Sequence, residues 1–195
     1  MRGHTPDRAT FEALAARHSV VPVWREVLAD LMTPVAALMR LRPESSAFLL
    51  ESVEGGERWG RYSFGGGDDF ATITARDGRV FVSGRPPVEP ADGEAPLAYV
   101  KRLLDSWSAP SIPGLPPLHG GAVGYIGYDC VRELEHLPSP PEDDLGLPDM
   151  ALVLTRTLVV FDHLAQKAFV ITNVVPGDDP AADHTAAVEA CDAAV

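Results

Sequence analysis

The dipeptide Asp77-Gly78 lies between two runs of residues that favour β-strands, Ala71–Ala75 and Val80–Ser83. An Asp-Gly pair readily adopts the positive φ angles that a two-residue hairpin turn requires. The two runs are therefore expected to pair as an antiparallel hairpin. No other segment of the chain gives so specific a local signal.

Further strands and helices are expected on both sides of this hairpin. The strands are predicted at 20–24, 47–53, 61–64, 120–128, 150–161 and 168–175. The helices are predicted at 10–18, 33–41, 97–107, 129–137 and from 179 onward. Thr33-Pro34 and Asp179-Pro180 each combine an N-cap residue with proline at the first helical position. Helices mixed with antiparallel hairpins, rather than alternating with parallel strands, predict an α+β fold of antiparallel sheet with packed helices.

The charge balance excludes some classes of partner. The chain has 195 residues and a formal net charge of −12. Nucleic acids and anionic membrane surfaces require a basic footprint, so neither is expected as a partner. The longest apolar stretch, Leu152–Phe161, contains Arg156 and is too short to cross a bilayer.

The two cysteines, Cys130 and Cys191, are isolated in the sequence. They form neither a CxxC motif nor a disulfide framework, so we expect buried structural thiols. The N-terminus lacks the apolar core of a signal peptide. These features together predict a cytoplasmic protein.

Glycine-rich and acidic segments have structural interpretations. Gly121, Gly124 and Gly127 follow a GxxGxxG spacing, which matches neither a phosphate-binding Walker loop nor a dinucleotide-binding motif. We expect these glycines to allow the close approach of another backbone. The run 65–67 is expected to form a bend, and the acidic run 142–144 a solvated loop.

The segment Leu49-Leu50-Glu51-Ser52 is the best candidate for a binding site. A carboxylate at the end of an apolar strand is costly to bury without a partner. Arg61, across the expected turn, is one possible partner and would make the pair purely structural. Alternatively, Glu51 binds a ligand ammonium group, Ser52 and Ser63 add hydrogen bonds, and Arg61 balances a ligand carboxylate.

No catalytic or metal-binding constellation is found in the sequence. The six histidines are scattered, without the HxH or HExxH spacing of a metal site. There is also no GxSxG elbow that would mark a nucleophilic serine. We therefore predict no catalytic residue, metal ligand or cofactor in this chain.

Several motifs match one family in one order. They are Val21-Pro22-Val23, Thr33-Pro34-Val35, Phe48-Leu49-Leu50-Glu51-Ser52, Arg61-Tyr62-Ser63-Phe64, Gly120-Gly121-Ala122-Val123-Gly124-Tyr125, Tyr128-Asp129 and Leu147-Pro148-Asp149-Met150. In this order they resemble the N-terminal region of anthranilate synthase component I, one of the chorismate-utilising enzymes. The resemblance extends from about residue 11 to residue 173.

The resemblance implies a part in tryptophan biosynthesis. In that family the large subunit is a lyase that converts chorismate to anthranilate, using Mg²⁺ and ammonia from a glutamine amidotransferase, component II. The catalytic residues lie in a C-terminal domain. Residues 1–195 would then be an N-terminal regulatory domain without that catalytic domain, and the chain alone is expected to be inactive.

The family's N-terminal domain takes part in allosteric feedback inhibition by tryptophan. Its Leu-Leu-Glu-Ser segment lines the inhibitor site, and a basic residue lies downstream. Carried over to this sequence, the expected tryptophan-binding residues are Leu50, Glu51, Ser52, Arg61, Tyr62 and Ser63. One departure concerns this site: the family usually has a β-branched residue after Ser-Phe, where this chain has Gly65. Its loss is expected to loosen the strand and weaken ligand binding.

Three alternatives remain open from the sequence. The chain resembles the same region of aminodeoxychorismate synthase component I, and of secondary-metabolite relatives that aminate chorismate. It could also be a free-standing amino-acid-binding or interaction module. The final helix lacks a glycine cap or a basic last turn near 193–195, so we expect the chain to be part of a longer protein. Apolar surface covered by the remainder is expected on 120–128 and 150–161.

Overall fold

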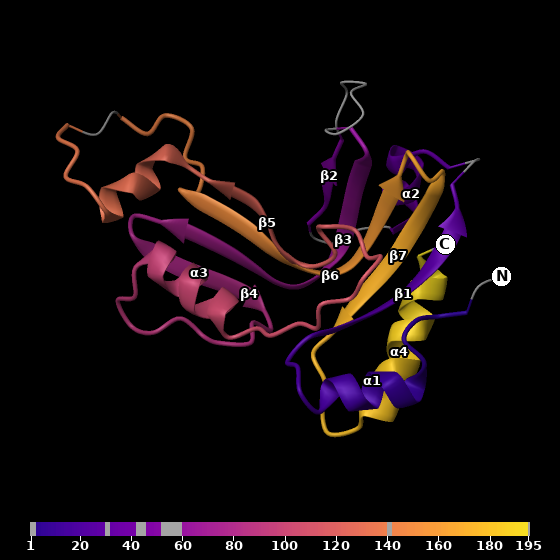
Figure 1. Ribbon diagram of the computed structural model, residues 1–195. Coiled ribbons are helices and arrows are strands. Elements are labelled where there is room, and N and C mark those ends of the chain that lie inside the picture. The colour runs from indigo at the N-terminus through magenta and orange to yellow at the C-terminus, as the bar shows by residue number, and fades with distance from the viewer. Residues whose placement is uncertain (1–2, 30–31, 42–45, 52–59, 140–141, 195) are drawn as a thin grey trace. The chain divides into compact units, whose positions relative to one another are not determined.

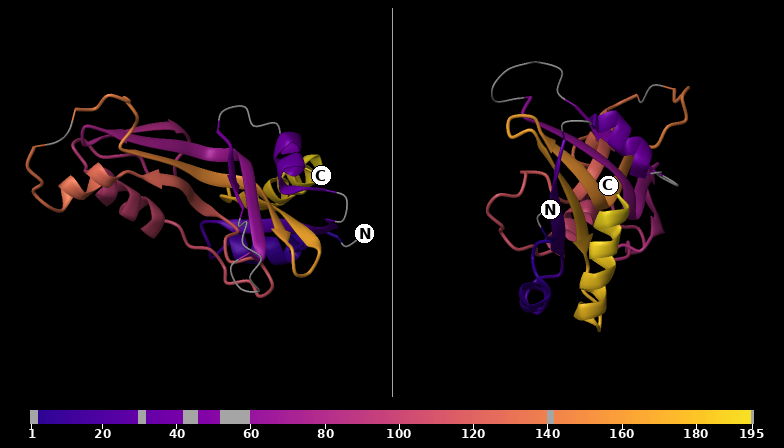
Figure 2. Two further views of the ribbon diagram at one scale, coloured as in Figure 1. Left: turned by 90° about the horizontal axis from the view of Figure 1, so that it is seen from above. Right: turned by 90° about the vertical axis from the view of Figure 1, so that its right-hand side faces the viewer.

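The computed structural model describes residues 3–29, 32–41, 46–51, 60–139 and 142–194. It divides the chain into two compact units. The first unit comprises Met1–Asp69, Trp107–Gly121 and Thr155–Val195, and the second comprises Phe70–Ser106 and Ala122–Leu154. Figures 1 and 2 show the elements of both units.

The fold is α+β, as predicted from the sequence. The strands are β1 (Val21–Leu28), β2 (Phe48–Leu50), β3 (Tyr62–Arg76), β4 (Arg79–Gly84), β5 (Gly121–Ile126), β6 (Met150–Asp162) and β7 (Lys167–Val174). The helices are α1 (Arg8–Ala15), α2 (Pro34–Leu41), α3 (Pro96–Asp105), the 3₁₀ helix η1 (Tyr128–Glu133) and α4 (Pro180–Ala193). Within the described residues the strands form a 7-stranded sheet in the order β1-β7-β6-β3-β2, with β4 paired to β3 and β5 paired to β6. The pairs β1–β7, β2–β3, β3–β4 and β6–β7 are antiparallel.

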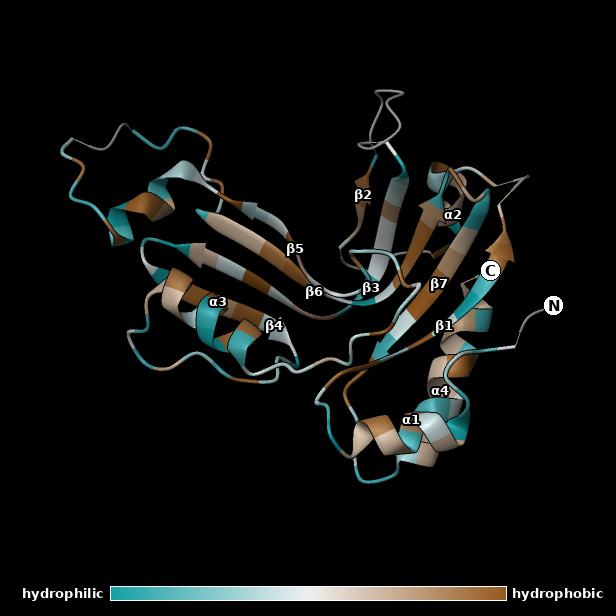
Figure 3. Cartoon of the chain, in the orientation of Figure 1, coloured by the Kyte–Doolittle hydropathy of each residue, from teal (hydrophilic) through white to brown (hydrophobic). Residues whose placement is uncertain are grey.

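The core of the first unit lies on both faces of the β6–β7 hairpin. Val159 and Phe161 pack with Cys191 of α4 on one face. Leu158 and Val160 pack with Trp24 and Tyr62, among others, on the other. Because successive side chains of a strand point to opposite faces, burial of both faces requires the nearly continuous apolar run seen here. Figure 3 shows hydrophobic residues along β7 and much of β6.

This burial contradicts one prediction. Residues 150–161 were expected to expose apolar surface, yet most of β6 is buried. The reason is its central position in the sheet, where β7 and β3 lie on its two sides. In β5, by contrast, Tyr125 and Ile126 are 45% and 51% exposed, as expected for that strand.

Helices α1 and α4 cover β1 and β7 in the first unit, and Phe11 of α1 packs with Val21, Val23 and Ala187. α1 begins at Arg8, earlier than the predicted start at residue 10, because the side chain of Asp7 caps it and accepts from the Thr10 amide at 2.8 Å. The Asp179 cap of α4 is confirmed: its carboxylate accepts from the Ala182 amide at 3.0 Å.

The second unit contains the predicted hairpin. Asp77 and Gly78 have φ angles of 50° and 68°, as a type I′ turn requires, and connect β3 to β4. The predicted helix 129–137 is a 3₁₀ helix that ends earlier, at Glu133. No helix in the described ranges is both long and apolar enough to cross a membrane.

The structure tests two predictions made for glycine-rich segments, the close approach at Gly124 and the bend at 65–67. A Cβ at Gly124 would lie 1.9 Å from the carbonyl oxygen of Ala151, so this glycine does allow two strands to approach closely. The predicted bend at 65–67 is wrong, because these residues continue β3. The low strand propensity of glycine is outweighed there by pairing with β2, in which Leu49 lies opposite Gly65 and Phe48 opposite Gly66.

Candidate ligand-binding site

The predicted site residues lie in the first unit, where β2 ends and β3 begins. Leu50 is the last residue of β2 and pairs in register with Phe64 of β3. Leu50 is 45% exposed, and Glu51, the next residue, is also exposed. Ser52 lies outside the described residues. The exposed carboxylate of Glu51 is accessible to a ligand, and no ion pair of Glu51 is found in the described part of the chain.

Arg61, directly before β3, binds Asp162 at the end of β6. Its Nε donates to Asp162 Oδ1 at 3.0 Å and its Nη2 to Oδ2 at 2.7 Å. This two-point geometry matches the planar guanidinium fork to the carboxylate. The hydrogen bonds from Arg61 hold the pKa of Asp162 below its ordinary value, against the opposing effect of burial. The structural interpretation that Arg61 pairs with Glu51 is therefore wrong; its acidic partner is Asp162.

The backbone turn after β6 holds the Asp162 carboxylate as well. The amides of Leu164 and Ala165 donate to Asp162 Oδ1 at 3.2 and 3.1 Å. Asp162 is thus buried with charge-assisted hydrogen bonds on both oxygens, which is the condition under which a buried carboxylate is tolerated. The sequence pattern of an apolar run ending in Asp162 was the available signal for such a partner.

Ser63 is paired with a histidine of the same turn. Ser63 Oγ lies 2.7 Å from His163 Nε2, and the backbone amide of His163 donates to the carbonyl oxygen of Arg61 at 2.9 Å. Ser63 is only 2% exposed, whereas His163 is exposed. Because Ser63 is buried, its hydroxyl supports the start of β3 in this structure and does not face solvent.

The Ser63–His163 pair forms no hydrolytic triad with a carboxylate of the described residues. A triad needs a carboxylate that holds the histidine by its second ring nitrogen. The nearby Asp162 instead accepts from Arg61 and from the turn amides. The arrangement is therefore suited to holding side chains in place and not to activating a nucleophile.

Tyr62 forms an apolar wall beside the charged pair. It is half-buried and packs against the cluster formed by Leu158, Val160 and their neighbours. The Arg61 guanidinium carbon lies 4.8 Å from the centroid of the Tyr62 ring, a cation–π distance. Arg61 and Tyr62 are in contact with each other, whereas Leu50 ends the strand paired with β3 and Glu51 follows it directly. An anion, a cation and apolar surface are the groups that a zwitterion with an apolar side chain requires.

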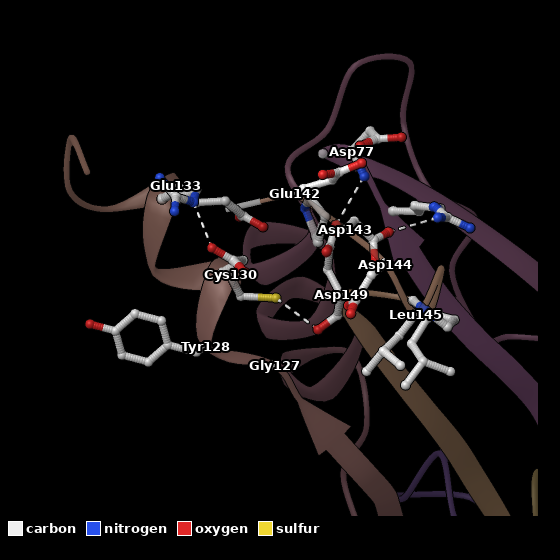
Figure 4. A pocket seen from close by; sticks show the side chains of 17 residues that line it. Asp77, Gly127, Tyr128, Cys130, Glu133, Glu142, Asp143, Asp144, Leu145 and Asp149 are labelled. Carbon is white, nitrogen blue, oxygen red and sulfur yellow. Dashed lines mark hydrogen bonds and ion pairs between the residues drawn. The ribbon is translucent and has the colours of Figure 1, made fainter. Parts of the chain in front are cut away.

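A separate cavity of about 710 Å³ lies within the second unit (Figure 4). Acidic side chains dominate its lining: Asp77, Asp129, Glu133, Glu142, Asp143, Asp144 and Asp149. Both of its guanidinium groups are paired, Arg76 with Asp143 at 2.9 Å and Arg132 with Asp129 at 2.6 Å. Glu142, Asp143 and Asp144 are exposed, as expected for a solvated loop. Among the residues that the structure describes, no three His, Cys, Asp or Glu side chains are arranged so that they could hold a metal ion.

Comparison with known proteins identifies the family. The family model for chorismate binding enzymes matches residues 46–194. The chain belongs to the chorismate binding enzyme family. This confirms the resemblance noted from the sequence motifs.

Individual relatives bear the name anthranilate synthase component 1. The protein from Acetivibrio thermocellus is 38% identical over 161 residues, covering 83% of this chain and 33% of the relative. The protein from Mycobacterium tuberculosis (strain ATCC 25618 / H37Rv) is 44% identical over 177 residues, covering 88% of this chain and 34% of the relative. The protein from Pseudomonas putida is 41% identical over 179 residues, covering 90% of this chain and 36% of the relative. The chain thus spans about a third of the length of these curated relatives.

A solved structure supports the fold assignment. The crystal structure of anthranilate synthase component I from Streptococcus pneumoniae TIGR4 matches with a TM-score of 0.57 and 25% sequence identity. The match covers 85% of this chain and 34% of that chain.

Proposed function

We propose that this chain is the tryptophan-binding regulatory part, residues 1–195, of an anthranilate synthase component 1. The full-length protein would convert chorismate to anthranilate in tryptophan biosynthesis. The main support is the similarity to proteins of that name over 83–90% of the chain. Because the relatives described above carry this name, it is favoured over aminodeoxychorismate synthase.

The proposed ligand contacts follow from the charges at the site. Glu51 binds the tryptophan ammonium group, and Arg61 binds the carboxylate. Leu50 and Tyr62 contact the indole ring, and Ser52 forms a hydrogen bond with the ligand. Ser63 supports the site indirectly, through its pair with His163 at the start of β3. The observation that carries this proposal is the placement of an exposed carboxylate after β2 and a fixed guanidinium before the paired strand β3.

Catalysis belongs, in this proposal, to the rest of the full-length protein. Residues outside this chain would hold Mg²⁺ and chorismate, and a glutamine amidotransferase component would supply ammonia in the cytoplasm. Tryptophan would inhibit by favouring a conformation that binds chorismate poorly, which is a coupling between two sites. On this proposal the 195-residue chain alone does not form anthranilate.

The test is a tryptophan titration by calorimetry on the full-length protein. Glu51→Ala is expected to raise the Kd for tryptophan by at least tenfold, because a charge-assisted contact is lost. Glu12→Ala, which removes an exposed carboxylate from α1, is the matched control and should leave the Kd unchanged. Equal Kd values for the unaltered protein and Glu51→Ala would overturn the assignment of Glu51.

A further inference from the structure

The first two residues after the apolar part of β6 lie against the start of β3. Asp162 binds the side chain of Arg61, and the amide of His163 binds the Arg61 carbonyl oxygen. These contacts join segments that are 101 and 102 residues apart in sequence. The turn between β6 and β7 therefore holds both the backbone and the side chain of Arg61.

The pair with Asp162 leaves part of the guanidinium group available. Arginine has five N–H donors, and this pair uses one on Nε and one on Nη2. The Arg61 side chain is 41% exposed, whereas that of Asp162 is 3% exposed. The buried edge of the guanidinium thus faces Asp162, and its remaining donors can reach solvent or a ligand.

We propose that Asp162 is a positioning residue that orients Arg61 to receive the carboxylate of an amino-acid ligand. The proposal rests on the proposed function, because it assigns a role at the same site. Asp162 itself does not touch the ligand. Its carboxylate fixes one edge of the guanidinium, so that the opposite edge is presented without the rotameric freedom of an unpaired arginine.

The turn amides make this arrangement rigid. Asp162 Oδ1 accepts from Leu164 and Ala165 as well as from Arg61, so the carboxylate is oriented before Arg61 binds to it. A carboxylate held in this way favours one guanidinium orientation over others. The site would therefore discriminate between ligands that have a carboxylate and ligands that lack one.

The experiment compares tryptophan with tryptamine, which keeps the indole and the ammonium group but lacks the carboxylate. Both are titrated by calorimetry into the full-length protein and into its Asp162→Asn variant. We expect the variant to bind tryptophan at least tenfold more weakly while its Kd for tryptamine changes less than twofold. A general structural defect would weaken both ligands equally and would overturn the proposal.

Two further variants keep the test decisive if Asp162→Asn folds poorly. Arg61→Lys keeps the positive charge but cannot form the two-point pair, and it should lose the same preference for tryptophan over tryptamine. Asp143→Asn changes a carboxylate in another arginine pair, with Arg76, and should leave both Kd values unchanged. An unchanged preference in Arg61→Lys overturns this inference alone. Absence of tryptophan binding by the unaltered protein overturns the proposed function as well.

Discussion

The aromatic ring of Phe48 lies across Gly66 on the neighbouring strand. A Cβ added at position 66 would come within 2.3 Å of the Phe48 Cε1 atom. At the adjacent Gly65, an added Cβ would meet Leu49 Cδ1 at an ordinary 3.7 Å. Two consecutive glycines of β3 therefore differ in whether they can accept a side chain.

This difference predicts opposite effects of two alanine substitutions. Gly65→Ala should raise the free energy of unfolding by about 0.5–1 kcal/mol, because it reduces the freedom of the unfolded chain without a clash. Gly66→Ala should lower it by about 1–3 kcal/mol, because the Phe48 ring must move. Urea unfolding of both variants checks the prediction, and each is the control for the other. A stability loss in both would mean that position 65 is more crowded than the structure shows.

The same glycines show where sequence reasoning fails. The hairpin at Asp77-Gly78 was predictable because its turn residues determine the backbone locally. The long buried strands β6 and β7 were predictable from their apolar runs. The strand at 65–67 was missed because its cause is pairing with β2, and no residue within 65–67 indicates that pairing.

The sequence indicated the residues of the candidate site that follow β2 and precede β3, but not those at the end of β6. Glu51 and Arg61 were recognised as charged residues at the ends of strands. Asp162 and His163 were missed because they are 101 and 100 residues from their partners Arg61 and Ser63. The apolar run that ends in Asp162 shows that this carboxylate needs a partner, but a contact of that separation leaves no spacing pattern that identifies Arg61; the partner follows from the position of β6 beside β3 in the sheet.

The close approach of β5 and β6 in the second unit gives a second prediction. Gly124→Ala would place a Cβ against the Ala151 carbonyl oxygen, forcing the two strands apart. We expect a loss of about 2–3 kcal/mol in the free energy of unfolding, at the upper end of overpacking effects. Gly3→Ala, where an added Cβ meets nothing within 4 Å, is the control and should be neutral in the same urea titration. Unchanged stability of Gly124→Ala would contradict the strand spacing described here.

Acid should weaken the second unit through Glu94. Hydrogen bonds from Arg102 and from the Ala91 amide lower the pKa of Glu94 from 4.5 to about 2. Since the pKa is lower in the folded state, the contribution to stability is complete above about pH 4.5 and is lost as the pH falls towards 2. Glu94→Gln should reduce stability at pH 7 and flatten its decline between pH 4.5 and 2.

Thermal unfolding at a series of pH values measures this effect. Glu135 of the same unit is exposed and its carboxylate forms no ion pair among the residues that the structure describes, so Glu135→Gln is the matched control. Its unfolding midpoint should follow that of the unaltered protein at each pH. A Glu94→Gln profile parallel to the unaltered one over this range would show that the Arg102 pair does not stabilise the folded state.

The two cysteines provide one reporter for each unit. Cys191 in the first unit is fully buried, and its Sγ lies 3.3 Å from Thr172 Oγ1 and 3.4 Å from the Val23 carbonyl oxygen. Cys130 in the second unit is 5% exposed. Burial raises the pKa of both thiols, so each forms less of the reactive thiolate at pH 8 than an exposed cysteine does.

Alkylation by iodoacetamide at pH 8, followed by mass spectrometry, should therefore be slow at both cysteines in the native protein. Cys191 should react more slowly than Cys130, because its thiol is more deeply buried and has more hydrogen-bond partners. Since modification of a buried thiol requires local opening, the two rates measure the opening of each unit separately. Full reaction of both thiols in 8 M urea is the control for reagent access. Faster labelling of Cys191 would mean that the packing of α4 on β1 and β7 opens more readily than the second unit does.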